Sequence, residues 1–419
     1  MKEQVDLIVT GASEVVTVSG GGDGPLCGHA MDDCGVVREG AVAMRDGVVV
    51  AVDERSVLDA VYEGQHVLDA RGGTIIPGLI DPHTHPVFAT TREEEFDMRA
   101  KGATYQEITA SGGGIFSSVR ALRETPRDQL ESRLKIHLDR FLACGTTTIE
   151  AKSGYGLSLE HEILSLELLM EADVHHRVDI DPTCLAAHQV PPEFQDDREA
   201  YVDLVVNQIL PEVSRRGIAR SADVFCDEGA FTVEESRAVL AGAQKVGLDL
   251  RVHADELAPV GAAELAAQMG ARTADHLVMV SPEGIDAMVN ENVTPILLPG
   301  TSFSLRLPNK APADAMIEAG LPLALASDFN PGTCHISSMI EIIALACGTL
   351  GLTVAQALVA ATRNGAETLG VSGVRGRIQP GALADLVLLD VPNHLFLGYQ
   401  MGWNPVSAVV KNGEVAWQR

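Results

Sequence analysis

The stretch "TIIPGLIDPHTH", residues 74–85, begins as an apolar β-prone run and ends in two histidines one residue apart. In an extended chain residues i and i+2 point to the same side, so His83 and His85 project together while Thr84 points away. Two neutral imidazoles on one side of a strand end can hold a transition metal such as zinc. The alternative is a chance pair of histidines, one buried and one exposed.

The apolar part of this stretch recurs along the middle of the chain. Helical patterns lie between most of the repeats, as in residues 132–145 and 233–247, and each of these two closes on a glycine. Alternation of this kind predicts a parallel sheet, and eight units over about 250 residues predict a (β/α)₈ barrel of the TIM type. The eight candidate strands cover residues 74–81, 146–152, 177–188, 222–228, 248–256, 271–277, 294–299 and 321–328.

The two ends of the chain have a different pattern from the middle. "AVAMRDGVVVAVD" places Asp46-Gly47 between two β-prone runs, and "SAVVKNGEVAW" does the same with Asn412-Gly413. Both are β-hairpin signals. We therefore expect the termini to meet in one small, β-sandwich-like domain.

These patterns divide the chain into two predicted units. Residues 1–73 and 377–419 form the discontinuous β-domain, and residues 74–376 form the metal-dependent barrel. The length of 419 residues suits a barrel of about 250 residues plus a second module.

Composition and charge exclude several classes of partner. The formal net charge is −27 and the pI is near 4.8, which argues against nucleic acid or an anionic membrane surface as a partner. A small anionic substrate remains compatible, because a local arginine can outweigh the distant field. No apolar run is long enough to span a bilayer, and the start of the chain lacks a signal-peptide pattern.

The cysteines are seven in number and scattered, which predicts a cytoplasmic chain with reduced thiols. In "CGHAMDDC", Cys27, His29 and Cys34 lie close together. A structural zinc site is conceivable there, but no second ligand pair is nearby, so we favour an ordinary loop.

Ionisable residues gather where the predicted barrel strands end. Active sites of such barrels lie at the carboxyl ends of the strands. One histidine there would be unremarkable, but a series of them closed by an aspartate indicates a catalytic site. The residues at or just beyond these ends include His83, His85, His188, His253, Glu256, His276 and Asp328.

This arrangement resembles the metal-dependent amidohydrolase superfamily, in which the barrel is joined to a β-domain from both chain ends. Many members hold two metals bridged by a lysine after strand four. Strand four here ends in "VFCDEGAF" without a lysine, and Lys152 follows strand two. The resemblance therefore implies one divalent ion per subunit. Zinc is expected first and iron second, and the implied ligands are His83, His85, His253 and Asp328.

A closer resemblance, from about residue 40 to 415, is to the imidazolonepropionase family of histidine degradation. It implies hydrolysis of 4-imidazolone-5-propanoate, a cyclic amide, to N-formimidoyl-L-glutamate. It also implies a homodimer. The resemblance rests on the segments "REEEFDMRAKGATYQEITASGGGIFSSVRALR", "EAKSGYGLSLE", "AAHQVPPEF", "HADELAP" and "SDFNPGTC".

Family resemblance and chemistry together assign the catalytic roles. A metal lowers the pKa of a water molecule, which then attacks the ring carbonyl. Glu256 is expected to carry a proton from water to the leaving ring nitrogen. His276 is expected to polarise the carbonyl or stabilise the oxyanion, and Asp328 is a possible base as well as a ligand.

Arg92 is expected to grip the propionate of the substrate, since a guanidinium can bind a carboxylate through two parallel hydrogen bonds. The alternative for Arg92 is a surface arginine that pairs with the neighbouring glutamates. Thr333 stands where serine is expected in many relatives. The further substrate contacts implied by the family are Tyr155, His188, Glu256, Asn330, Gly332 and Thr333.

Two other functions are compatible with parts of this pattern. One is another mononuclear amidohydrolase that acts on a related cyclic amide or deaminates a heterocycle, but it leaves Arg92 without an obvious role. The other is a non-catalytic barrel, which predicts gaps among the ligands, and none is present. The remaining histidines in helical or connecting segments are expected to be solvated; they are His137, His161, His175 and His176.

Overall fold

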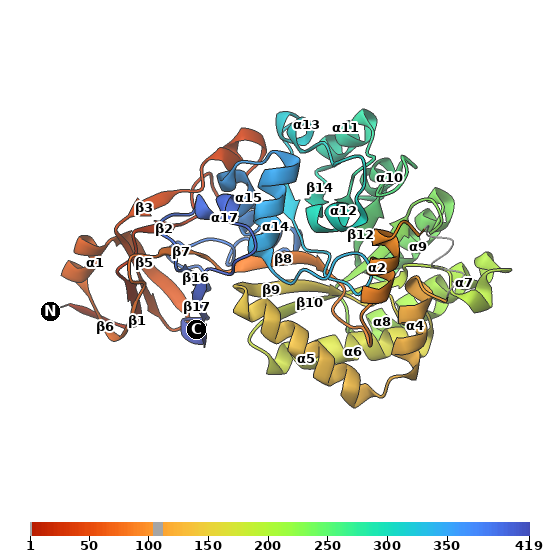
Figure 1. Cartoon of the computed structure of the whole chain (residues 1–419), viewed down its shortest axis with the longest axis horizontal. Helices are drawn as coiled ribbons and strands as arrows, with labels where there is room; N and C mark the ends of the chain where they lie inside the picture. The colour runs from red at the N-terminus through yellow and green to blue at the C-terminus, as the bar shows by residue number, and fades with distance from the viewer. Residues whose placement is uncertain (1, 104–111) are drawn as a thin grey trace.

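The computed structural model describes residues 2–103 and 112–419, so part of the segment that begins at Arg92 lies outside the described residues. Figure 1 shows a β-rich region that contains both chain ends beside a larger αβ region. The two regions correspond to the predicted β-domain and barrel.

Eight parallel strands form the barrel in chain order, each paired with the next. The ring closes where Thr84 bridges to Phe329 and the Asp328 N–H donates to the His83 carbonyl at 3.0 Å. The prediction of a (β/α)₈ barrel is confirmed. Its strands are β8 (Leu79–Thr84), β9 (Thr146–Lys152), β10 (Asp179–Ala187), β11 (Ser221–Cys226), β12 (Asp249–Ala254), β13 (Thr273–His276), β14 (Thr294–Leu297) and β15 (Ala324–Leu325).

The predicted strand over 74–81 is wrong as a single barrel strand. It divides at Gly78 into β7 (Thr74–Pro77), which pairs with strands of the β-domain, and β8 of the barrel. One apolar run thus serves two sheets, because residues on both sides of Gly78 are buried. Periodicity alone does not reveal this change of sheet.

The predicted strand over 321–328 is also shorter than expected, since β15 contains only two residues. Beyond it, the chain pairs with β8 through isolated contacts: the His85 N–H donates to the Phe329 carbonyl at 2.8 Å. Asp328 is therefore held beside His83 by barrel closure and not by a regular strand.

Helices surround the barrel (Figure 1). The two predicted helical segments are confirmed by α5 and α9, and α9 begins with a capping box between Thr232 and Glu235. The helices around and beyond the barrel are α2 (Glu93–Ala100), α4 (Ile115–Glu124), α5 (Arg127–Ala143), α6 (Leu159–His175), α7 (Arg198–Leu204), α8 (Leu210–Arg216), α9 (Val233–Lys245), α10 (Ala262–Met269), α11 (Pro282–Glu291), α12 (Pro299–Leu305), α13 (Ala313–Glu318), α14 (Met339–Leu345), α15 (Val354–Ala360), α16 (Arg363–Thr368) and α17 (Phe396–Tyr399).

Two sheets form the β-domain and share one apolar core, to which Val9 and Val42 of one sheet and Leu386 and Val410 of the other contribute. This is the predicted sandwich-like arrangement of both chain ends. One sheet has the order β5-β4-β1-β6 and the other β18-β17-β16-β7-β2-β3. Their bounds, with the one helix of this part, are β1 (Glu3–Thr10), β2 (Glu14–Val16), β3 (Val36–Arg38), β4 (Gly40–Arg45), β5 (Val48–Glu54), α1 (Arg55–Val61), β6 (Tyr62–Asp69), β16 (Leu386–Leu389), β17 (Val406–Lys411) and β18 (Glu414–Gln418).

The two predicted hairpins are confirmed and their turns touch each other. Asp46 and Gly47 join β4 to β5, Asn412 and Gly413 join β17 to β18, and all four residues have positive φ. A Cβ on Gly413 would lie 3.2 Å from the Gly47 Cα. Glycine is therefore needed both for the turn geometry and for the contact between the two ends of the chain.

His137 corrects one prediction, because it is buried and not solvated. Its Nδ1 lies 2.9 Å from the Pro86 carbonyl oxygen, and its ring stacks on Phe88. Helical spacing explains the burial, since His137 lies on the same face of α5 as Leu134 and Phe141. Of the other three histidines, His175 is exposed and His161 and His176 are half-buried.

The segment from Cys27 to Cys34 forms an ordinary loop with a short 3₁₀ turn over Gly28–Asp32. His29 lies 3.2 Å from carboxylate oxygens of both Asp32 and Glu318, and all seven cysteines of the chain are free.

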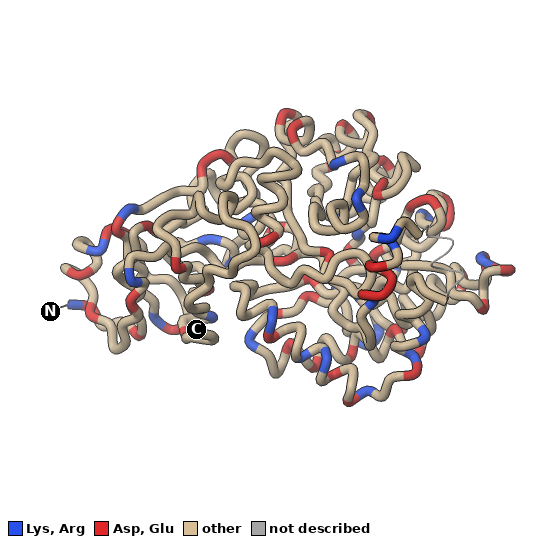
Figure 2. The backbone as a smooth tube through the Cα atoms, viewed as in Figure 1, with Lys and Arg blue, Asp and Glu red and all other residues tan. Residues whose placement is uncertain are grey.

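Acidic and basic residues are intermingled along the outer helix α5 (Figure 2). Among the described residues, no helix has the length and apolar character needed to cross a membrane.

Candidate active site

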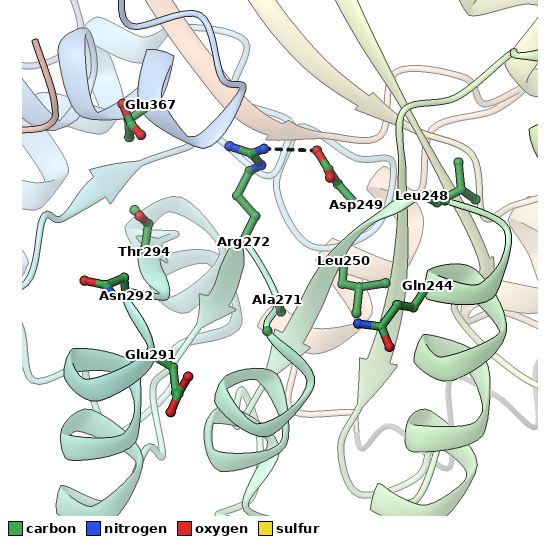
Figure 3. A pocket seen from close by; sticks show the side chains of 12 residues that line it. Gln244, Leu248, Asp249, Leu250, Ala271, Arg272, Glu291, Asn292, Thr294 and Glu367 are labelled. Atoms are coloured by element: carbon green, nitrogen blue, oxygen red, sulfur yellow. Dashed lines mark hydrogen bonds and ion pairs between the residues drawn. The ribbon is translucent and has the colours of Figure 1, made fainter.

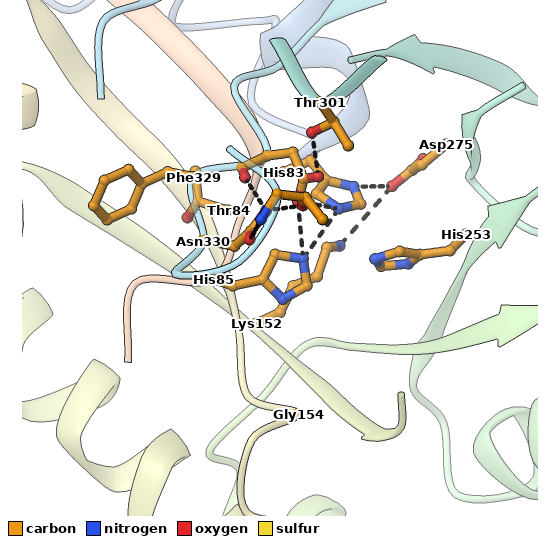
Figure 4. Close-up of polar contacts among 12 residues, drawn as sticks. His83, Thr84, His85, Lys152, Gly154, His253, Asp275, Thr301, Phe329 and Asn330 are labelled. Carbon is orange, nitrogen blue, oxygen red and sulfur yellow. Dashed lines mark hydrogen bonds and ion pairs between the residues drawn. The ribbon is translucent and has the colours of Figure 1, made fainter. Parts of the chain in front are cut away.

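Three buried histidines converge at the carboxyl end of the barrel. His83 lies on β8, His85 just beyond it and His253 on β12, and their ligand atoms lie within 4.8 Å of one another. The His83 and His85 Nε2 atoms are 3.3 Å apart. Figure 4 shows the three imidazoles turned toward one another, as the spacing of the first two predicts.

The Asp328 carboxylate lies next to these histidines. Its Oδ1 lies 3.3 Å from His85 Nε2 and 3.7 Å from His83 Nε2. Its Oδ2 accepts a hydrogen bond from the Thr301 hydroxyl at 2.5 Å, which fixes the plane of the carboxylate. The backbone of Asp328 has a φ of +52°, a conformation that non-glycine residues seldom adopt and that is often found at functional sites.

The pKa values of the three histidines favour the neutral form of each ring. Burial, together with the nearby Lys152 ammonium, lowers the pKa of His83 well below its ordinary value and that of His85 to about 3. Burial also lowers the pKa of His253 to about 4. Neutral imidazoles are the form that ligates metals.

The residues present fit a metal ion. His253 Nε2 is buried and has no hydrogen-bond partner among the described residues. Three imidazoles and a carboxylate form a donor set that suits zinc and similar transition metals. The structure thus brings the predicted ligands His83, His85, His253 and Asp328 together, and their binding of a metal stays a prediction.

Two aspartates that the sequence reasoning missed support these ligands. Asp275 Oδ2 lies 2.6 Å from His83 Nδ1, and Asp223 Oδ2 lies 3.0 Å from His253 Nδ1. A carboxylate behind a metal-ligating histidine orients the ring and fixes its tautomer. Asp275 directly precedes His276 in a short buried strand, and this was the available signal.

Glu256 and His276 lie near the three histidines, with the His276 ring centroid 5.2 Å from that of His253. His276 Nδ1 is 3.7 Å from Glu256 Oε1, and His276 Nε2 is buried without a hydrogen-bond partner among the described residues. Burial, together with the charges of Asp328 and Asp227, raises the pKa of Glu256 well above its ordinary value. Burial lowers the pKa of His276 to about 3, so its ring is neutral.

Glu256 is held by the loop after β12. The backbone N–H groups of Glu256 and Leu257 donate to Asp227 Oδ2 at 2.7 and 2.9 Å. The Asp255 carboxylate accepts four backbone N–H bonds from residues 260–263. The carboxyl group of Glu256 therefore projects from a rigid loop.

Arg92 pairs with a neighbouring glutamate, as one alternative expects, but it is not a surface arginine. Its Nη2 pairs with Glu95 Oε2 at 2.7 Å, but its side chain is only 12% exposed. Its Nε is buried and lacks a partner among the described residues. A Cβ on Gly332 would overlap Arg92 Nη1, so the absence of a side chain there makes room for the guanidinium.

Arg99 is a second arginine at this place and was missed. It lies seven residues after Arg92, two helical turns along α2, and its Nη2 donates to the Gly332 carbonyl at 2.9 Å. Burial and the neighbouring Arg92 charge lower the pKa of Arg99. The i, i+7 spacing of the two arginines was the signal in the sequence.

Tyr155 and His188 form a wall next to His85. The His188 ring stacks on that of His85 with centroids 5.3 Å apart, and the Tyr155 ring lies 5.5 Å from that of His188. His188 Nδ1 lies 3.0 Å from the Gly154 carbonyl oxygen, so Nδ1 carries the proton and Nε2 is an acceptor.

The Asn330 side chain organises its own loop. Its Oδ1 accepts the N–H groups of Gly332 and Thr333 at 2.8 and 2.7 Å, and its Nδ2 donates to the Asp328 carbonyl and the Thr333 hydroxyl. The side chain thus shapes the loop that carries Gly332. A direct contact of Asn330 or Thr333 with substrate stays a prediction.

A hollow of about 530 Å³ lies at the opposite, amino-terminal end of the barrel strands. Figure 3 shows the ion pair between Asp249 and Arg272 across it, at 3.1 Å. None of the predicted site residues lines it. The predicted site residues lie instead at the carboxyl end of the strands, with the histidines.

Comparison with known proteins shows the family to which the chain belongs. The family model described as "Amidohydrolase family" matches residues 99–416. Imidazolonepropionase from Geobacillus kaustophilus is 46% identical, over 98% of this chain and 97% of that protein. The imidazolonepropionases from Symbiobacterium thermophilum and Haloarcula marismortui are 46% and 44% identical, each over 98% of this chain and over 97% and 96% of those proteins.

Solved structures show the same fold at lower identity. An adenosine deaminase from Xanthomonas campestris with bound zinc has a TM-score of 0.71 and 18% identity, covering 99% of this chain and 93% of that one. A variant of atrazine chlorohydrolase from Arthrobacter aurescens, complexed with zinc, has a TM-score of 0.74 and 18% identity, covering 98% and 94%. By its family match and its full-length relatives, the chain belongs to the amidohydrolase family and, within it, to the imidazolonepropionases.

Proposed function

We propose that this chain hydrolyses 4-imidazolone-5-propanoate to N-formimidoyl-L-glutamate, a step of histidine degradation. The observation that carries the proposal is the sequence identity of 40–46% with imidazolonepropionases over nearly the full length of the chain. The geometry supports it, because two half-buried arginines, Arg92 at the N-cap of α2 and Arg99 within it, lie around Gly332 in the loop that follows Asp328. In the reaction water adds to the ring carbonyl, the carbon–nitrogen bond opens, and the nitrogen takes up a proton.

His83, His85, His253 and Asp328 would hold one divalent ion, with zinc expected first and iron second. Such an ion, when bound, lowers the pKa of a water molecule and polarises a carbonyl. The carboxylates of Asp275 and Asp223 lie 2.6 and 3.0 Å from the Nδ1 atoms of His83 and His253, and a proton on each Nδ1 would leave the Nε2 lone pairs for the ion.

Glu256 is the group we assign to proton transfer. Burial and the charges of Asp328 and Asp227 raise its pKa, which makes the carboxylate a stronger base. It can take the proton from the attacking water and return it to the ring nitrogen as the bond breaks. His276, as a neutral imidazole, can donate a hydrogen bond to the oxygen that becomes negative.

Arg92 would bind the propionate carboxylate, and Arg99 would reinforce it. Two guanidiniums around Gly332 form a local positive site in a strongly acidic protein. Their mutual repulsion is relieved when an anion binds between or beside them. Tyr155 and His188 would contact the flat ring of the substrate as part of the same pocket wall.

The test is turnover of freshly prepared 4-imidazolone-5-propanoate by zinc-loaded protein, followed by the appearance of N-formimidoyl-glutamate. A chelator-treated sample and the same sample with zinc restored serve as controls. We expect turnover that disappears with the chelator and returns with zinc. Absence of turnover by protein with one zinc per chain would contradict the proposed substrate and leave the metal site standing.

The homodimer and the cytoplasmic location stay predictions. Light scattering of the purified protein would test the first and cell fractionation the second.

A further inference from the structure

Lys152 is a fully buried lysine at the end of β9. Its ammonium donates to Glu150 Oε1 at 2.9 Å and lies 2.8 Å from Asp223 Oδ2 and 3.9 Å from Asp275 Oδ2. Burying a charge is unfavourable unless it is paired, so this position needs a reason. Figure 4 shows Lys152 next to the three histidines, with its link to Asp275.

Two of the carboxylates around Lys152 lie directly against histidines of the proposed metal site. Asp275 lies against His83 Nδ1, at 2.6 Å. Asp223 lies against His253 Nδ1 at 3.0 Å, and its Oδ1 also accepts the His253 backbone N–H at 3.2 Å.

Glu150 reaches the remaining pair through Thr84. Its carboxylate accepts the Thr84 N–H at 3.4 Å, and its carbonyl accepts the Thr84 hydroxyl at 2.6 Å. Thr84 stands between His83 and His85, so Glu150 fixes the backbone from which both ligands project. One ammonium is therefore connected to His83 and to His253 through one carboxylate each, and to the backbone beside His85 through Glu150 and Thr84.

Lys152 is the cation that lets these carboxylates lie close together in a buried space. Without it, Glu150, Asp223 and Asp275 would repel one another, and the ring orientations that depend on two of them would loosen. Burial opposes the charge, but the carboxylates of Asp223, Glu150 and Asp275 outweigh it and raise the pKa of Lys152.

We propose that Lys152 is a positioning residue of the metal site, which sets the affinity for the metal by holding the carboxylates that orient His83 and His253. The role follows from its contacts and does not depend on which substrate the enzyme takes. Failure of the turnover assay above would leave this proposal intact.

Lys411 offers a matched control. It is also buried, and it lies between two aspartates, 2.5 Å from Asp179 Oδ2 and 2.8 Å from Asp385 Oδ2. It is at the end of β17, and neither aspartate contacts a metal-binding histidine in the described structure. Replacing Lys411 removes the same kind of buried ion pair without touching the site.

The experiment measures the dissociation constant of zinc by competition with a chromophoric chelator, for the native chain, Lys152→Met, Lys152→Arg and Lys411→Met. We expect Lys152→Met to weaken zinc binding about 10- to 100-fold, the usual effect of losing support behind ligands. Lys152→Arg should recover part of the loss. Lys411→Met should bind zinc like the native chain even if it unfolds more easily.

Two outcomes would overturn the proposal. One is native zinc affinity in Lys152→Met, and the other is an equal loss in Lys411→Met, which would reveal a general effect of destabilisation. If Lys152→Met does not fold, the double variant Glu150→Gln/Lys152→Met removes one charge of each sign and serves instead. Weaker zinc binding by that variant than by Glu150→Gln alone supports the role of Lys152, and equal binding by the two refutes it.

A double-mutant cycle with Asp223→Asn tests the proposed route. If Lys152 acts through Asp223, the losses of zinc affinity in the two single variants should not add in the double variant. Full additivity would contradict this connection.

Discussion

His83 and His85 were predictable as a pair, because alternation along a strand is a property of the backbone and not of the fold. The arginines were predictable only in part. Arg92 was found through a family resemblance, while Arg99 became apparent only when both guanidiniums were seen around Gly332. At this scale, residues next to one another in sequence are easier to assign than residues that meet in space.

Replacing Arg92 should affect substrate binding and not the metal. We expect Arg92→Ala to raise KM for imidazolonepropionate about 10- to 100-fold, because charge-assisted hydrogen bonds to the carboxylate are lost. The KM of Arg92→Lys should lie between those of the native chain and Arg92→Ala, since lysine keeps the charge but not the two parallel hydrogen bonds. Steady-state kinetics and zinc analysis measure both effects.

The control for Arg92 is an imidazolone with an uncharged side chain, on which the native chain and Arg92→Ala should perform alike. An unchanged KM for the propionate substrate, or loss of zinc from Arg92→Ala, would refute the carboxylate role.

Glu256 is expected to act in the chemical step. Glu256→Gln should lower kcat about 10²- to 10⁴-fold with zinc still bound, because the amide cannot carry the proton. The exposed Glu228, replaced in the same way, should leave kcat unchanged. A near-normal kcat in Glu256→Gln would remove Glu256 from the proton path.

At the scale of elements, the run over 74–85 shows how one segment can serve two sheets. The apolar pattern predicted a strand but not its division at Gly78, since both halves are buried. The hairpins were predictable because Asp-Gly and Asn-Gly adopt the turn locally. The two-residue β15 was not, because its pairing with its neighbour depends on how the barrel closes.

The contact of His394, just before α17, with β2 predicts a pH-dependent stability. Cys34 and Glu14 raise the pKa of His394 to about 9, and His394 Nδ1 lies 2.7 Å from Glu14 Oε1. A folded-state pKa above the ordinary value of about 6.5 stabilises the fold fully below that pH. This contribution is lost as the pH rises through about 9.

The measurement is the free energy of unfolding by urea near pH 6 and near pH 9.5. The difference between the native chain and His394→Gln should be larger at the lower pH. The exposed His66, replaced by glutamine, should show no such difference. If the difference in the free energy of unfolding between the native chain and His394→Gln does not change with pH, the stabilising role of protonated His394 is contradicted.

At the scale of the whole molecule, the proposed metal site would link strands far apart in sequence, so metal removal should lower stability. A ligand present at 100 times its dissociation constant stabilises the folded state by about 2.7 kcal/mol. We expect a chelator to lower the melting temperature and added zinc to restore it. His83→Ala should melt at one temperature with or without zinc, and an equal response of that variant would contradict its role as a ligand.

The sequence by itself determined the alternation of strands and helices, the two hairpins and the spacing of the metal-binding histidines. These features follow from local backbone geometry and from side chains close together in the chain. The family resemblance added the reaction and the residues expected to perform it.

Only the tertiary structure decided which charged side chains lie behind the proposed metal ligands. Lys152, Asp223 and Asp275 come from three strands, and closure of the barrel brings them to within hydrogen-bond or ion-pair distance of one another. The sequence placed Lys152 after strand two and excluded it as a bridge between two metals, but it could not show which carboxylates it faces. That depends on strand register around the ring, which is set by packing of the whole barrel and not by any single segment.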